Sequence, residues 1–215
     1  MSSQKLIIVD YGLGNLYSVM QACKHCSSAN ISISSNVSEI ENADKLILPG
    51  VGAFKDGMEG LNQKNLIPSI KKHVADNKPL LGICLGMQML STYSYEFCKT
   101  PGLDVIRGEV VPIKDINENE FSLKTPHIGW ASLYPSQNDA WRGSIFDNLT
   151  NDPFVYLLHS YHFIPENKNN VLAYSNYGGK KLTVAVIQGN IIGCQFHPEK
   201  SGEVGLQIIR NFLLL

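Results

Sequence analysis

The stretch KPLLGICLGMQML, residues 78–90, decides the fold. After Pro79, the run Leu80–Cys84 has the length and composition of a strand buried on both faces. A helical pattern follows at once, and Gly82-Ile83-Cys84-Leu85-Gly86 has the form of a nucleophile elbow. Glycines two residues either side leave room for a strand-to-helix corner that projects the central side chain. The stretch predicts a parallel sheet with a reactive cysteine at the carboxyl end of one of its strands. A buried cysteine with small packing neighbours is the alternative.

The other elements predict a single α/β domain over residues 1–215. The first hundred residues read β-α-β-β-α-β-α, which favours a parallel sheet covered by helices on both faces. The expected strands are 5–10, 31–35, 45–50 and 80–84, and the expected helices are 15–27, 57–77 with a break near Pro68, and 86–97. Further strands are expected at 108–113, 127–134, 154–163, 171–178, 182–188 and 190–197, before a final helix at 203–215. Gly189-Asn190 predicts a hairpin, so antiparallel strands are appended to a mostly parallel central sheet.

Composition excludes several kinds of partner. The 215 residues include 18 basic and 19 acidic side chains, a net charge of −1, which gives no electrostatic reason to expect nucleic acid or an anionic membrane as partner. Apolar runs are strand-sized, well short of the ~20 residues that a bilayer span requires. The five cysteines lack disulfide-framework spacing and the first residues lack a basic leader, so we expect a cytoplasmic protein with reduced thiols.

A thiolate nucleophile requires a base, and the base requires an orienting acid. His197 ends an apolar run in CQFHPEK, and in extended geometry Glu199 would project to the same side. Cys84, His197 and Glu199 therefore form a candidate triad, in a chain order that fits an α/β-hydrolase less well. Of the other histidines, His25 and His73 lie on helical patterns, which favours a solvated face. His127, His159 and His162 lie in the strand-rich half, and the sequence assigns them no role.

Two segments offer N–H groups for an oxyanion. The N–H of Leu85 follows the nucleophile at the expected helix start. In ILPGVGAF, residues 47–54, Gly50 allows its peptide to turn the N–H of Val51 inward, although a plain turn is the alternative. No cofactor or metal is required by such a mechanism.

Two other motifs are discounted. Cys23 and Cys26 lie three apart on an expected helix without a second ligand pair, so packing explains them better than a metal. DYGLGN, residues 10–15, follows a strand as a dinucleotide loop does, but Tyr17 stands where the third glycine is needed.

Four segments together resemble the triad-type (class I) glutamine amidotransferases: PGVGAF, GICLGMQML, HSYHF and GCQFHPEKS. DYGLGN, PHIGW (126–130) and YGG (177–179) narrow the resemblance to glutaminase subunits of imidazole glycerol phosphate synthases, which serve histidine biosynthesis. The resemblance implies hydrolysis of L-glutamine and transfer of the ammonia to a (β/α)₈-barrel synthase subunit in a heterodimer.

The resemblance also implies roles for single residues. Cys84 would be the nucleophile, His197 the base and acid, and Glu199 the orienting carboxylate. Glutamine would be bound by Gly52, Gln88, Ser160 and Tyr161. The synthase subunit would contact Asn15, Trp130 and Lys200.

Three positions depart from the usual family pattern: Ala131, His162 and Asn176. They lie on the expected partner side, so a related subunit that serves surface-sugar amidotransferases is an alternative. A stand-alone cysteine hydrolase and a catalytically inactive binding subunit also remain alternatives.

Overall fold

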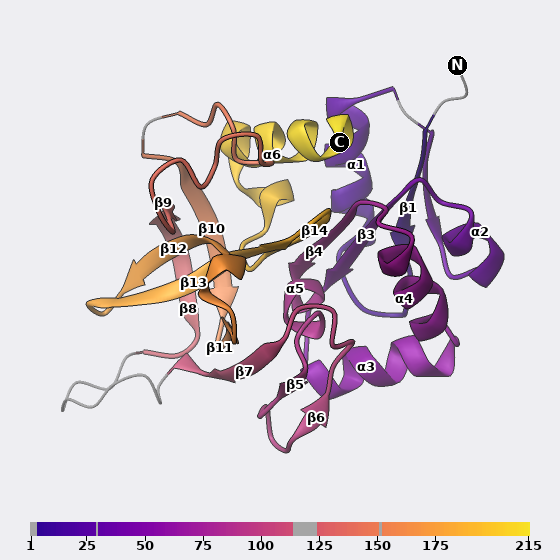
Figure 1. Ribbon diagram of the computed structural model, residues 1–215, viewed down its shortest axis with the longest axis horizontal. Coiled ribbons are helices and arrows are strands. Elements are labelled where there is room, and N and C mark those ends of the chain that lie inside the picture. The colour runs from indigo at the N-terminus through magenta and orange to yellow at the C-terminus, as the bar shows by residue number, and fades with distance from the viewer. Residues whose placement is uncertain (1–3, 29, 114–123, 151) are drawn as a thin grey trace.

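The computed structural model describes residues 4–28, 30–113, 124–150 and 152–215. In this part of the chain a central sheet of eight strands runs in the order β2-β1-β3-β4-β14-β13-β12-β9 (Figure 1). Its parallel half consists of β2 (Asn30–Ser34), β1 (Lys5–Val9), β3 (Lys45–Gly50), β4 (Leu80–Cys84) and β14 (Ile191–Cys194). Antiparallel pairing adds β13 (Lys180–Gln188), β12 (Val171–Tyr177) and β9 (Tyr134–Pro135).

Helices cover both faces of the parallel half, because alternate strand residues point to opposite sides. On one face α1 (Leu16–Cys26) and α6 (Gly202–Leu214) lie side by side over Ile8 and Ile83 (Figure 1). The other core cluster contains Ile7 and Leu46 with residues of α2 (Val37–Glu41), α3 (Phe54–Gln63), α4 (Ile67–Ala75) and α5 (Leu85–Met89). The expected α/β fold class is confirmed. Among the described residues, no helix combines the length and apolar character that a membrane span needs.

Two smaller sheets flank the central one. The first pairs β8 (His127–Ser132) with β10 (Phe154–His159). The second runs β11-β7-β5-β6, comprising β11 (Tyr161–Pro165), β7 (Gly108–Pro112), β5 (Tyr93–Ser94) and β6 (Thr100–Pro101). The stretch expected as one strand at 154–163 is therefore divided at Ser160, where the chain passes from one sheet to the other. Short 3₁₀ turns are η2 (Lys168–Asn170) and η3 (Pro198–Lys200).

The helix expected over 86–97 is wrong in length, because α5 ends at Met89. The carbonyls of Met89 and Leu90 accept hydrogen bonds from the N–H groups of Leu103 and Val105, so they are not available to extend the helix. By contrast, the break expected near Pro68 is present: α3 and α4 are separate helices, and Pro68 occupies the first turn of α4.

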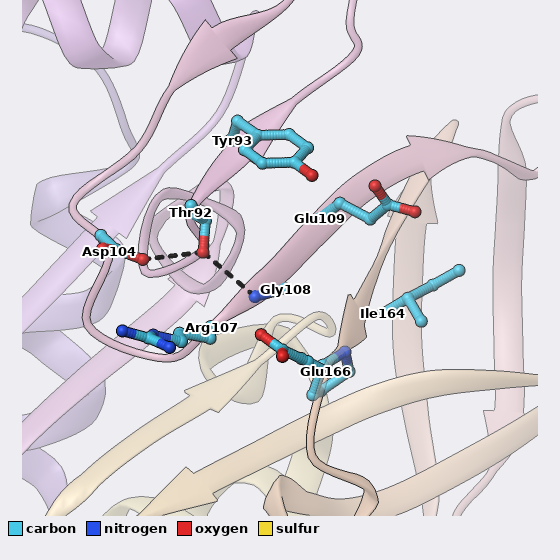
Figure 2. Close-up of a pocket in the computed structure, with 9 residues that line it drawn as sticks. Thr92, Tyr93, Asp104, Arg107, Gly108, Glu109, Ile164 and Glu166 are labelled. Atoms are coloured by element: carbon cyan, nitrogen blue, oxygen red, sulfur yellow. Dashed lines mark hydrogen bonds between the residues drawn. The ribbon is translucent and has the colours of Figure 1, made fainter.

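The chain that follows α5 also forms a surface pocket of about 520 Å³, which lies between β5, β7 and the end of β11 (Figure 2). The Thr92 hydroxyl donates to Asp104 over 2.7 Å and accepts from the Gly108 N–H over 3.2 Å. These bonds fix the start of β7 and leave the pocket lined by Arg107, Glu109 and other polar side chains. The pocket shares no lining residue with the one that contains Cys84.

Candidate active site

Cys84 stands at the corner between β4 and α5 in a strained conformation, with φ +55° and ψ −109°. The corner is tight because its glycines pack directly on backbone. A Cβ on Gly82 would lie 2.8 Å from the Gly86 carbonyl, and one on Gly86 would overlap the Leu48 carbonyl oxygen. Although Cys84 is only 7% exposed, it lines a pocket of about 290 Å³. The thiol therefore faces a cavity of the size that a small amino acid needs.

His197 lies in the same pocket and carries the expected carboxylate partner. Its Nδ1 lies 2.9 Å from Glu199 Oε1, and the two side chains are 4% and 1% exposed. The geometry differs from the expected extended strand, because β14 ends at Cys194 and Glu199 lies in η3. The carboxylate accepts the Nδ1–H and leaves the other ring nitrogen for the sulfur.

The pKa of His197 reflects its two neighbours. Burial alone lowers this pKa, but hydrogen bonds and charge attraction from Cys84 and Glu199 outweigh it and raise the pKa from 6.5 to about 10. The imidazole is thus favoured in its protonated form beside the sulfur, which is the state needed to protonate a departing amine.

The oxyanion and substrate-binding residues expected from the sequence also lie at this pocket. In the parallel register of β3 and β4, Gly50 lies opposite Cys84, so the Gly50–Val51 peptide borders the thiol. Leu85 is the first residue of α5. The expected substrate contacts all line the cavity: Gly52, Gln88, Ser160 and Tyr161.

The matching family model is described as glutamine amidotransferase class-I, and it covers residues 7–215. The chain belongs to the class I glutamine amidotransferases.

Curated relatives agree with this amidotransferase membership. The chain is 46% identical to imidazole glycerol phosphate synthase subunit HisH 1 of Legionella pneumophila (strain Paris), over 96% of this chain and 97% of that protein. It is 43% identical to the HisH subunit of Lactococcus lactis, over 98% of each. A solved structure of PurLQS from Thermotoga maritima superposes with a TM-score of 0.71 at 18% identity, covering 99% and 98%, and shows the fold.

Two residues of this amidotransferase site were missed in the sequence: one contacts the thiol and the other lines the pocket. Gln195 is fully buried; its Nε2 lies 3.7 Å from Cys84 Sγ and its Oε1 accepts from Gln88 Nε2 over 2.9 Å. A polar residue inside the apolar run before His197 was the available signal. Glu96 lines the pocket and accepts the N–H of Phe54, while burial raises its pKa. It gave no signal, because it lies in the stretch wrongly expected to be helical.

The three histidines left open are buried and favoured in the neutral form. Burial lowers the pKa of His159 to about 3 and of His162 to about 4, and it also lowers the pKa of His127. His159 lines the pocket, but its Nδ1 contacts the Tyr161 carbonyl rather than the sulfur. Within the described residues no cluster of three or more His, Cys, Asp or Glu side chains could hold a metal ion.

Replacing Gly86 with alanine should destabilise the elbow. Because the new Cβ would overlap the backbone at Leu48, we expect a loss of about 3 kcal/mol in the free energy of unfolding, measured by urea denaturation. Gly57→Ala is the matched control, since the atoms nearest its Cβ would belong to the side chains of Met89 and Leu85, which can shift, and not to backbone. Equal stability of the two variants would contradict the tight corner.

The raised pKa of His197 predicts a pH-dependent contribution to stability. The folded protein binds this proton more tightly than the unfolded chain, so the stabilisation is complete below pH 6.5 and is lost as the pH rises through about 10. The loss of unfolding free energy in His197→Gln should therefore be largest at about pH 6 and shrink toward about pH 10. Denaturation curves for both proteins at several pH values test this, and a pH-independent difference would refute it.

Proposed function

We propose that this chain is the glutaminase subunit of an imidazole glycerol phosphate synthase of histidine biosynthesis. It hydrolyses L-glutamine and passes the ammonia to a synthase subunit. The observation that carries the proposal is the meeting of Cys84, His197 and Glu199 around one amino-acid-sized pocket. The similarity to HisH subunits over almost the whole chain supports the choice of pathway.

The geometry supports a two-step thioester mechanism. The sulfur of Cys84 attacks the carboxamide carbon, and the tetrahedral oxyanion is held by the N–H groups of Leu85 and Val51, each such donor being worth about 3 kcal/mol. His197 gives its proton to the departing nitrogen, so that ammonia leaves and a γ-glutamyl thioester remains. His197 then takes a proton from water, which attacks the thioester and releases glutamate.

The polar lining of the pocket offers groups for binding glutamine. Glu96 supplies a carboxylate for the α-ammonium group, and its bond to the Phe54 N–H holds it in place. Gln88 donates to the Tyr161 carbonyl over 3.2 Å and to Gln195, so this substrate-binding side chain is linked through Gln195 to the sulfur. Gly52, Ser160 and Tyr161 complete the expected binding set.

An exposed apolar face next to this pocket supports docking of the synthase subunit. Paired residues of antiparallel strands share a face, and the register pairs Ile128 with Leu158 and Trp130 with Tyr156. Ile128 and Trp130 are 58% and 56% exposed, and Leu158 also lines the catalytic pocket. A partner seated there would border the catalytic pocket in which the ammonia forms. We infer a (β/α)₈-barrel synthase as this partner in a heterodimer.

The other proposed contacts are Asn15 and Lys200, which are both exposed. Asn15 also caps α1 by accepting the Ser18 N–H over 3.3 Å. The η3 turn that carries Lys200 contacts α1, the helix that Asn15 caps, so the two proposed contacts belong to neighbouring elements. Cytoplasmic location and the absence of nucleic acid or membrane partners remain part of the proposal.

Glutaminase activity depends on one thiol in this account. With the synthase subunit present, Cys84→Ala should lower the release of glutamate from glutamine at least about a thousandfold. Cys98→Ala removes an exposed thiol outside the pocket and should leave the rate unchanged. An active Cys84→Ala protein would contradict the proposal, and a wild type that cleaves esters or peptides but not glutamine would favour a stand-alone hydrolase.

Trp130 should dominate the affinity for the synthase subunit. Trp130→Ala should weaken binding about 30-fold, as measured by titration calorimetry, because large aromatic side chains carry most interface energy. Ile164→Ala is the control, since Ile164 is 41% exposed but lies on β11, in the other small sheet. Equal effects of both variants, or normal affinity of Trp130→Ala, would exclude this face.

A further inference from the structure

The DYGLGN segment, residues 10–15, is not explained by the chemistry above. It joins β1 to α1, yet Tyr11 in this loop is only 2% exposed. Its hydroxyl donates to the Pro49 carbonyl over 2.7 Å. Pro49 precedes the Gly50–Val51 peptide, whose N–H is a proposed oxyanion donor. A loop of the first strand thus holds the backbone immediately upstream of that donor.

The packing around Gly50 shows how closely the loop supports this backbone. A Cβ on Gly50 would overlap the Tyr11 hydroxyl, and the next nearest atoms would be Leu85 Cβ at 3.0 Å and the Gly86 nitrogen at 3.3 Å. A Cβ on Gly14 would lie 3.5 Å from the nitrogen and Cα of Gly50. The Tyr11 hydroxyl therefore occupies the volume that a side chain at position 50 would take.

We propose that Tyr11 is a positioning residue for the oxyanion hole, an inference that rests on the proposed glutaminase function. A peptide unit is planar, so a bond to the Pro49 carbonyl also fixes the direction of the Gly50 N–H. Only the two backbone dihedrals of Gly50 then separate this fixed plane from the plane that carries the Val51 N–H. With Tyr11 in place, the Val51 N–H can change direction only by rotation about the backbone of Gly50, and the end of β3 stays fixed.

The hydroxyl keeps its proton throughout the working pH range. Burial, with a further contribution from the charge of Cys84, raises the pKa of Tyr11 well above its ordinary value of 10. Tyr11 is therefore a donor whenever the thiol reacts. The bond to Pro49 does not titrate with the catalytic groups.

The test compares Tyr11→Phe with Tyr174→Phe, a control that loses a hydroxyl on β12, both measured with the synthase subunit bound. Oxyanion donors act in the transition state, so Tyr11→Phe should lower kcat about tenfold while KM for glutamine stays within about twofold. Alkylation of Cys84 by iodoacetamide forms no oxyanion, so its rate should stay within about twofold of wild type. Tyr174→Phe should match wild type in all three readouts.

An unchanged kcat in Tyr11→Phe would overturn the inference while leaving the glutaminase proposal intact. A parallel fall in kcat and alkylation would also overturn it, because Tyr11 would then act on the thiol. A wild type without glutaminase activity would instead overturn the proposed function, and this inference with it.

A second pair of variants tests the contact through the coupling between positions 11 and 50. Gly50→Ala should lose most activity, because its Cβ would overlap the Tyr11 hydroxyl. In the double variant Gly50→Ala/Tyr11→Phe that oxygen is absent, so kcat should exceed that of Gly50→Ala about threefold or more through non-additive coupling. A double variant as impaired as the product of the two single effects would contradict the proposed contact.

Discussion

The close packing of α5 on the end of β3 is the constraint on which the rest of the site depends. Gly86 lies so near the Leu48 carbonyl that no side chain fits, and this contact pulls the helix start directly over the strand ends. Cys84 is forced into its strained conformation at the same corner. The strain costs roughly 1–3 kcal/mol, which the packing of the buried strands on both sides offsets. The sulfur thereby reaches the wall of the pocket.

Parallel strand pairing brings the distant partners of this sulfur to it. β14 lies beside β4 with Cys194 opposite Ile83, so the chain that continues from β14 delivers His197 to the corner although it is more than a hundred residues away. β3 lies on the other side with Gly50 opposite Cys84. Nucleophile, base and oxyanion peptide thus come from three adjacent strand ends, the edge at which open α/β sheets bind ligands.

Much of this arrangement follows from local sequence signals, and the rest does not. The elbow could be predicted because two glycines flank Cys84. The strands could be predicted because short continuous apolar runs are typical of strands buried on both faces. α2 was missed because five residues capped by Asn36 leave little periodicity. The overlong helix and the missed Glu96 share one cause: the chain after Met89 is shaped by bonds to residues 103–105, which no local pattern reveals. Gln195 was missed because its role depends on contacts across the sheet.

The most direct measurement is mass spectrometry of protein quenched during turnover of glutamine with the synthase subunit bound. A chain whose reactivity comes from one strained corner should carry a single glutamyl group, on the peptide that contains Cys84. The four other cysteines, at positions 23, 26, 98 and 194, serve as internal controls and should stay unmodified. Glutamate formation without an adduct on Cys84, or with the adduct on another cysteine, would contradict the account.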